Sequence, residues 1–497
     1  MIKRLFLALL VLTVLLAGAL AANTLRQGSR QVAVPPLAPL AVDKARVAES
    51  LAIALRAKTQ SGLLDPAGQA AAFDTLHAHL KARYPLVHTA LEREVVGGHS
   101  LLYTWRGSDA KAAPVALMAH QDVVPIAPGT ESLWKQAPFS GALHDGFVWG
   151  RGALDDKSNL ITQLEALEML LQSGVKPQRT VYFVFSHDEE VGGQQGAVKI
   201  VELFKQRGIR LAWVLDEGLA LTEGVLVGVS KPVALIGLAE KGIASLKLTA
   251  ETAPGHSSTP PGPGASAIGM LSAALTRLDQ TPFQGGVQGA AAEMFAAVAP
   301  ELPFGQRLAL SNLWLFRPLV ERTLQKGAAT NAMMRTTTAL TIFNAGNKEN
   351  VLPGRAEAVV NFRILPGETT QSVLAHVKSV VADERISIVP VGAGSDPSRL
   401  SSSQSAPFKL IERTVREVFP DSIVAPGLML AASDARHFDS VSDQSFRFMP
   451  IRFNSEDLKR PHGTDERIAV DQLADMVRFY HRLLQTAAGP PTEGKLP

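Results

Sequence analysis

The chain has 497 residues, of which 46% are hydrophobic and 19% are charged. This composition excludes intrinsic disorder for most of the chain, and a formal net charge of +3 excludes the strongly basic surface of a dedicated nucleic-acid binder. The chain has no cysteine, so disulfides, thiolate nucleophiles and cysteine-bound metals are also excluded. Any metal ion must therefore be held by His, Asp and Glu.

The amino terminus is an apolar segment, residues 5–22, preceded by Lys3 and Arg4. A basic flank before a short apolar run is typical of a secretory signal, and the small residues at 19–21 offer a cleavage point. Eighteen helical residues also reach about 27 Å, which suffices for an uncleaved anchor in a thin bilayer. We favour the anchor slightly, and a buried helix least, because the run has no polar face. Either favoured interpretation places the rest of the chain outside the cytoplasm, as a membrane-anchored, periplasmic, extracellular or luminal protein.

After a proline-containing tether, strands and helices alternate. Apolar spacing and β-branched runs predict helices over 42–59, 70–84, 159–172 and 197–206, and strands over 115–119, 180–185 and 211–215. Such alternation predicts an α/β fold, with a mostly parallel sheet flanked by helices.

A second unit interrupts this pattern. Its predicted order is strand 243–251, helix 265–278, strands 334–343 and 356–365, helix 370–382 and strand 386–391. This order is that of an α+β module with an antiparallel sheet, and residues 281–326 form an insertion within it. We therefore expect a signal or anchor over 1–22, a linker over 23–40, one domain split between 41–241 and 394–488, and a second domain over 242–393 inserted into it.

Polar side chains follow the predicted strands of the first unit at the points where they end. They are His120 and Asp122, then Asp155 and Asp156 before a helix, Asp188, Glu189 and Glu190, Asp216 and Glu217, and a late loop residue, His462. Sites in open α/β sheets form outside the carboxyl ends of the strands, so these side chains should converge. Singly, each has a structural explanation, such as a helix N-cap or a solvated face. A buried cluster of carboxylates, however, needs a cation, and these ligands suit Zn²⁺, with Mn²⁺ and Co²⁺ as alternatives.

Two adjacent glutamates can divide the chemistry of such a site. Neighbouring residues in an extended loop point in opposite directions, so one of Glu189 and Glu190 can bind metal while the other acts as general base. Two ions would acidify a shared water. Asp122, two residues after His120, is placed to accept the proton of the far imidazole nitrogen.

Taken together, these motifs resemble those of a dizinc metallopeptidase family. The matching runs are His120-x-Asp122, Gly150-Arg151-Gly152-x-x-Asp155-Asp156-Lys157, Asp188-Glu189-Glu190, Asp216-Glu217-Gly218 and His462. The family includes aminoacylase, acetylornithine deacetylase, succinyl-diaminopimelate desuccinylase and glutamate carboxypeptidase. The run Gly255-His256-Ser257-Ser258 is most similar to that of the carboxypeptidase S and secreted N-fatty-acyl-amino-acid synthase/hydrolase subgroup.

The resemblance implies a role for each matching residue. Two zinc ions per subunit would be bridged by Asp155, one completed by His120 and Asp216 and the other by Glu190 and His462. Glu189 would be the general base acting on a metal-bridging water, and Asp122 would orient His120.

The resemblance also implies that the split domain is catalytic and that the inserted domain is a lid of the dimerisation type, and it gives roles to residues of the lid and the hinge. His256 would polarise the scissile carbonyl, and in dimeric relatives this histidine comes from the partner subunit. Asn350, Arg363 and Arg436 match positions that bind the substrate carboxylate.

The implied activity is hydrolysis of the amide bond of N-acyl amino acids or of C-terminal peptide bonds, and also formation of that bond by the reverse reaction. The alternatives are a peptide-specific carboxypeptidase or dipeptidase, and a non-catalytic binding protein that would have lost metal residues. The apolar residues of 281–326 are a candidate acyl groove, although such residues more often form core. Expected partners are a small-molecule substrate, a membrane through the N-terminal segment and a second subunit through the lid, but no nucleic acid.

Overall fold

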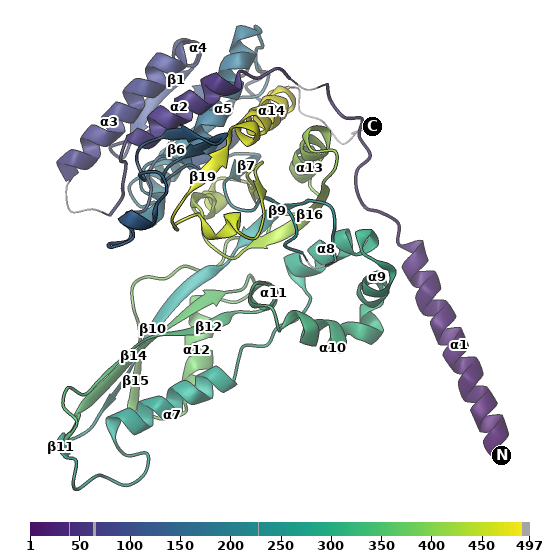
Figure 1. The fold of residues 1–497 in the computed structure, drawn as a ribbon, viewed down its shortest axis with the longest axis vertical. Helices are drawn as coiled ribbons and strands as arrows, with labels where there is room; N and C mark the ends of the chain where they lie inside the picture. Colours follow the sequence, from purple (N-terminus) through teal and green to yellow (C-terminus); the bar gives the residue numbers. More distant parts are fainter. Residues whose placement is uncertain (39, 63–65, 227, 490–497) are drawn as a thin grey trace.

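The computed structural model describes residues 1–497 except 39, 63–65, 227 and 490–497. Figure 1 shows a catalytic body, an elongated lid that extends from it, and a helix, α1 (Ile2–Arg26), that projects away from both. The chain reaches the lid from the body along β9 (Val233–Glu240) and β10 (Gly242–Glu251), which are separated by Lys241 alone.

The body is built on a mixed ten-stranded sheet. Its main order is β1-β2-β6-β3-β7-β17-β9-β8-β18, with β16 paired to β9. The strands besides β9 are β1 (Glu92–Val96), β2 (Ser100–Trp105), β3 (Val115–His120), β6 (Val181–Ser186), β7 (Trp213–Asp216), β8 (Leu221–Thr222), β16 (Ile423–Met429), β17 (Ser445–Arg447) and β18 (Arg452–Phe453). The central pairs β6/β3, β3/β7 and β7/β17 are parallel, which confirms the predicted mostly parallel sheet.

Helices cover both faces of this sheet because its strands are apolar on both sides. On β3, Val115 and Leu117 belong to a core shared with α2, α5, α13 and α14, whereas Ala116 and Met118 pack with α6. These helices are α2 (Lys44–Arg56), α5 (Lys157–Gln172), α6 (Ala197–Gln206), α13 (Ala406–Val418) and α14 (Val470–Ala487). The body is completed by α3 (Pro66–Arg83), α4 (Pro85–Ala90) and a small sheet of β4 (Ala142–His144), β5 (Phe147–Trp149) and β19 (Arg467–Ala469).

The lid has the predicted α+β architecture. Its antiparallel sheet has the order β12-β14-β10-β15 and is packed on one face by α7 and α12. Its elements besides β10 are α7 (Ala267–Gln280), β12 (Thr337–Ala345), β14 (Arg355–Ile364), α12 (Thr370–Val381), β15 (Ile386–Pro390) and a two-stranded tip of β11 (Gly255–His256) and β13 (Val351–Leu352). Alternate residues of β14 are buried, as a half-covered strand requires.

The insertion at 281–326 packs on the body and not only within the lid. It forms α8 (Gly289–Val298), α9 (Phe304–Ser311) and α10 (Leu313–Leu324), followed by α11 (Ala328–Met334). Met294 and Val298 of α8 share a core with Ile423 and Ala425 of β16. Apolar residues of α8 and the inner side of α10 are therefore core, whereas Phe304, Trp314, Leu315 and Leu319 are exposed.

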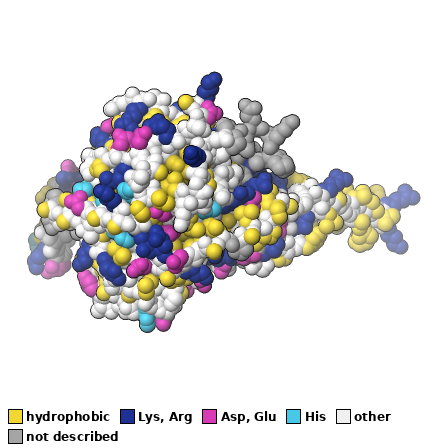
Figure 2. Space-filling view, turned by 90° about the horizontal axis from the view of Figure 1, so that it is seen from above, with side chains coloured by type: hydrophobic (Ala, Val, Ile, Leu, Met, Phe, Trp, Pro, Cys, Tyr) yellow, Lys and Arg dark blue, Asp and Glu magenta, His cyan; other side chains and the backbone are white. Residues whose placement is uncertain are grey.

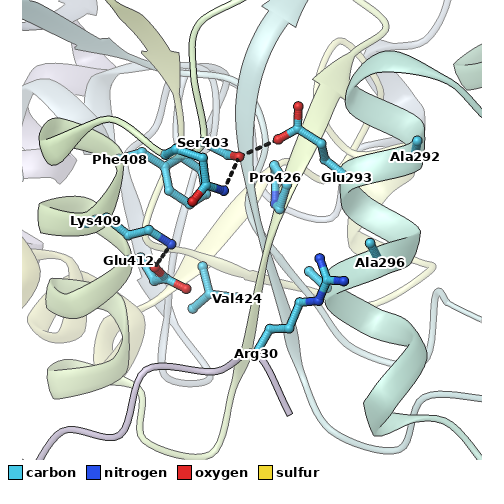
Figure 3. A pocket seen from close by; sticks show the side chains of 12 residues that line it. Arg30, Ala292, Glu293, Ala296, Ser403, Phe408, Lys409, Glu412, Val424 and Pro426 are labelled. Atoms are coloured by element: carbon cyan, nitrogen blue, oxygen red, sulfur yellow. Dashed lines mark hydrogen bonds and ion pairs between the residues drawn. The ribbon is translucent and has the colours of Figure 1, made fainter. Parts of the chain in front are cut away.

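Two further features lie on the insertion side. Among the described residues, α1 is the one helix long and apolar enough to cross a membrane, with a mean hydropathy of 2.8 over its best window and 6% of that window buried. A cavity of about 270 Å³ lies between α8 and α13, and Figure 3 shows Arg30, from the segment after α1, reaching into it. Its lining comes from α8, α13, β16 and their flanks, so it is separate from the polar residues at the strand ends.

Candidate active site

The polar residues predicted to converge come together at the carboxyl edge of the sheet, where β3, β6 and β7 end. Asp155 lies between two histidines. Its Oδ1 is 2.9 Å from His120 Nε2 and its Oδ2 is 3.2 Å from His462 Nε2, which is also 3.1 Å from Glu190 Oε2. A carboxylate that presents one oxygen to each of two imidazoles occupies the position that a bridge between two cations requires.

The loop that carries Asp155 is held by a buried carboxylate, Glu466. This carboxylate accepts hydrogen bonds from the backbone N–H groups of Gly152, Leu154 and Asp155 and pairs with Arg151 at 2.6 Å. Because Glu466 follows His462 closely in the chain, this contact also ties the late histidine loop to Asp155. Neither the polar residues at the strand ends nor the family motifs identify Glu466 as part of the site.

Glu217, and not Asp216, faces His120. Glu217 Oε1 lies 3.6 Å from His120 Nε2, and ligand atoms of His120, Asp156 and Glu217 form one compact group, as do those of His120, Asp155 and Glu190. Asp216 instead accepts the backbone N–H groups of Ala435 at 2.7 Å and of Glu217 at 2.9 Å. Successive side chains at a strand end point to opposite faces, so only one of this pair can reach the cluster.

Asp122 organises both halves of the site. Its Oδ1 is 3.2 Å from His120 Nδ1, the contact anticipated from the two-residue spacing. Its two carboxylate oxygens also accept the backbone N–H groups of Glu189 at 3.2 Å and Glu190 at 3.1 Å. One fully buried carboxylate therefore orients an imidazole and the adjacent glutamate pair.

The protonation pattern of the cluster indicates a deficit of positive charge. Hydrogen bonds to Asp155 and Glu190 raise the pKa of His462 to about 10. Burial would lower the pKa of His120, but Glu217, Asp122 and Asp155 together raise it well above its ordinary value. Burial, followed by the nearby Glu217 charge, raises the pKa of Glu189 well above its ordinary value. These raised pKa values mean that the three groups hold protons at positions where metal cations would otherwise neutralise the carboxylates.

The donor set fits metal ions. It consists of imidazole nitrogens and carboxylate oxygens, the ligands that zinc accepts in the absence of thiolate. Within the described part of the chain, buried Glu190 Oε1 and Asp156 Oδ1 have no hydrogen-bond partner. Buried polar atoms of this kind normally have a partner, which a metal ion can supply.

The predicted lid residues lie apart from this cluster. His256 is exposed in β11, next to Asn350, whose carbonyl accepts the Ser257 N–H at 3.2 Å. Figure 1 shows β11 at the far tip of the lid, away from β6 and β7. Within one chain, therefore, His256 and Asn350 do not join the metal cluster.

The two predicted arginines lie nearer the hinge. Arg363 is on β14 opposite Ile243, next to the start of β10. Arg436 is in the turn after β16, with Nη1 3.9 Å from Glu240 Oε1, and it follows Ala435, whose N–H binds Asp216. The body thus supplies one arginine beside the site, and the lid supplies the other at its base.

Comparison with known proteins agrees with this geometry. Residues 116–486 match peptidase family M20/M25/M40. The chain is similar to probable carboxypeptidase S-like 2 of Dictyostelium discoideum (38% identity, 97% of this chain and 93% of the relative). It is also similar to the N-fatty-acyl-amino acid synthase/hydrolase PM20D1 of Xenopus tropicalis (42% identity, 82% of this chain and 80% of the relative).

Among solved structures, an M20 family metallo-carboxypeptidase from Sulfolobus solfataricus shares the fold, with a TM-score of 0.63 at 18% identity over 90% of this chain and 100% of that one. The family match covers most of the chain, and the matched range includes Asp155, both histidines of the cluster and the glutamate pair. The chain therefore belongs to peptidase family M20/M25/M40.

Proposed function

We propose that this protein is a two-metal amidohydrolase that cleaves, and in reverse forms, the amide bond of N-acyl amino acids. The observation that carries the proposal is the carboxylate of Asp155 held between His120 and His462. The relatives named as N-fatty-acyl-amino acid synthase/hydrolases support the substrate class. The relative named as carboxypeptidase S-like supports a second candidate, a carboxypeptidase acting on peptides.

Two zinc ions would be held by residues that the fold already groups. Asp155 would bridge them, His120 and Glu217 would complete one site, and Glu190 and His462 would complete the other. Glu217 takes the role expected of Asp216, because its carboxylate faces His120 while that of Asp216 is occupied by backbone N–H groups. Bound zinc would supply Lewis acidity and lower the pKa of water at the site.

Glu189 would move the proton during the reaction. Its carboxylate accepts a proton from the attacking water as the water oxygen bonds to the carbonyl carbon. When the C–N bond breaks, the same group returns the proton to the amine nitrogen.

The test of this role is Glu189→Gln, which preserves shape but removes the base. Turnover should fall by about 10²–10⁴-fold while zinc content stays at the wild-type value. The exposed Glu202→Gln, on α6, is the matched control. Unchanged turnover would refute the assignment, and loss of zinc would show a structural role. Turnover of N-acyl amino acids of increasing chain length, compared with dipeptides, separates the two candidate substrates.

The lid tip would complete the site of a second subunit. β12 is an edge strand of the lid sheet, and it exposes Leu340, Ile342 and Phe343. An exposed edge of this kind is a template for pairing with another chain. Pairing of two lids would allow His256 of one subunit to reach the carbonyl in the other, and Asn350, Arg363 and Arg436 would bind the substrate carboxylate.

We further propose that α1 is retained as a membrane anchor. Its last turns are part of the folded body: Thr24 is fully buried, and its Oγ1 accepts Asn312 Nδ2 at 3.0 Å. Asn23 Nδ2 donates to Asn312 Oδ1 at 2.9 Å. Signal-peptide cleavage at residues 19–21 would leave the contacts of Asn23 and Thr24 with Asn312 within a few residues of a free amino terminus. Lys3 and Arg4 would remain on the cytoplasmic side, which places the catalytic body on the other side.

A further inference from the structure

Helix α10 has a buried apolar face and also carries large apolar side chains on its exposed side. Its inner face, with Phe316, Val320 and Leu324, belongs to a small core that includes Val287 and Met334. Its outer face presents Trp314, which is 68% exposed, and Leu319, which is 61% exposed. A helix of a water-soluble domain normally exposes mainly polar residues opposite its buried stripe, so these exposed apolar side chains indicate a contact with another surface.

The exposed face extends beyond α10. Leu315 of α10 is 41% exposed, and Phe304, the first residue of α9, is 54% exposed. We call Phe304, Trp314, Leu315 and Leu319 the α9–α10 patch. Scattered exposed leucines are ordinary, but an aromatic and aliphatic group on one pair of helices marks an interaction site.

The charges around the patch are basic. Arg322 is exposed on α10 and is followed by Lys326, while the exposed Arg317 pairs with Glu321 at 3.4 Å. The acidic residue of this helix, Glu321, is turned inward, where its Oε1 accepts the Val287 N–H at 2.9 Å. Basic groups that flank exposed tryptophan and leucine suit an interface with anionic lipid headgroups.

The patch is held at a fixed position relative to α1. Asn312, the residue between α9 and α10, donates to Leu20 O and Thr24 Oγ1, and Arg307 of α9 donates to Thr24 O. Figure 1 shows α10 on the side of the insertion toward which α1 extends, and Figure 2 shows apolar side chains uncovered along α1. The patch therefore lies where the apolar stretch of α1 leaves the body.

We propose that the α9–α10 patch inserts into the headgroup and outer acyl region of the bilayer that α1 crosses. The proposal rests on the anchor function proposed for α1. Trp314 would occupy the depth that tryptophan prefers in membranes, and its neighbours would lie in the acyl boundary. A second contact with the bilayer, beside the spanning helix, would resist tilting of the body against the membrane surface. The catalytic body is then held close to a surface in which amphiphilic N-acyl amino acids concentrate.

The absence of cysteine in the chain allows a direct depth measurement. Single cysteines are introduced in the full-length protein by Trp314→Cys and, separately, Leu319→Cys, and each is labelled with an environment-sensitive fluorophore. Leu143→Cys is the control, because Leu143 is 56% exposed on β4 of the body. The proteins are reconstituted in phosphatidylcholine–phosphatidylserine vesicles that contain a nitroxide-labelled lipid, and amide hydrolysis confirms that each variant is folded.

Vesicle flotation after an alkaline wash tests whether α1 anchors the protein in the bilayer. Quenching of the fluorophore by the nitroxide-labelled lipid tests whether the patch enters the bilayer. We expect all three variants to float, with the labels at positions 314 and 319 quenched about threefold or more relative to the label at position 143. Flotation with equal quenching at the three positions overturns the patch proposal and leaves the anchor intact. Absence of flotation overturns the anchor, and the patch proposal with it. Cross-linking between two copies of the unlabelled Trp314→Cys variant, with weak quenching of its labelled form, would show that a second chain covers the patch and would equally overturn the proposal.

Discussion

Neutralising Glu466 should destabilise the protein strongly, although this residue binds neither substrate nor metal. The carboxylate is fully buried and pairs at 2.6 Å with Arg151, which is itself 2% exposed. Glu466→Gln keeps the side-chain shape, but it leaves the guanidinium as an uncompensated buried charge. Removing one partner of a buried pair costs about 3–5 kcal/mol, and three backbone N–H groups lose a charged acceptor.

The same substitution should weaken metal binding. One of the three backbone donors to Glu466 is the N–H of Asp155 at 3.2 Å, so the loop that positions the Asp155 carboxylate loses its support. Substituting a residue that orients a metal ligand typically weakens metal affinity by about 10–100-fold. Zinc affinity can be measured by competition with a chromophoric chelator.

The assay is urea unfolding of the zinc-free protein in detergent, followed by tryptophan fluorescence. The control is Glu92→Gln, which breaks an exposed pair with Arg106 of similar length, 2.7 Å. That change should cost at most about 1 kcal/mol. The double variant Arg151→Met/Glu466→Gln removes the stranded charge and should recover part of the loss. Equal midpoint shifts for Glu466→Gln and Glu92→Gln would refute the reasoning.

Three further predictions follow from the site and the hinge. Glu217→Gln should reduce bound zinc from two ions toward one, whereas Asp216→Asn should retain both; the opposite pattern in elemental analysis would restore Asp216 as the ligand. Mixing inactive His256→Ala with inactive Glu189→Gln should restore about a quarter of wild-type turnover, because half the dimers would contain one intact site; no recovery after subunit exchange would show that His256 does not act across subunits. Burial lowers the pKa of Lys241 to about 8, below its unfolded value of about 10.4. Between these two pH values the folded chain binds fewer protons than the unfolded chain. The free energy of unfolding should therefore rise with pH by up to roughly 3 kcal/mol. Lys241→Met should abolish that rise in urea titrations compared between about pH 8 and about pH 10.

Local sequence pattern predicted most of the architecture. Strands β3 and β6 and helix α6 lie at or within a residue or two of their predicted positions, because short apolar runs and helical stripes are local signals. The convergence of His120, Asp155, Glu190 and His462 was also predictable, since the carboxyl ends of parallel strands meet at one edge.

Other features depended on contacts between distant segments. No local pattern shows that α8 leaves the lid to pack on β16, or that Glu466 supports the loop of Asp155, because each contact joins segments far apart in the chain. Choosing between Asp216 and Glu217 requires knowing at which residue β7 ends, since a shift of one residue exchanges the two faces of a strand. Sequence by itself therefore determined the fold class and the chemistry of the ligands. Only the tertiary structure decided which carboxylate faces His120 and how far the lid histidine lies from that cluster, because facing and distance are set by packing and not by residue type.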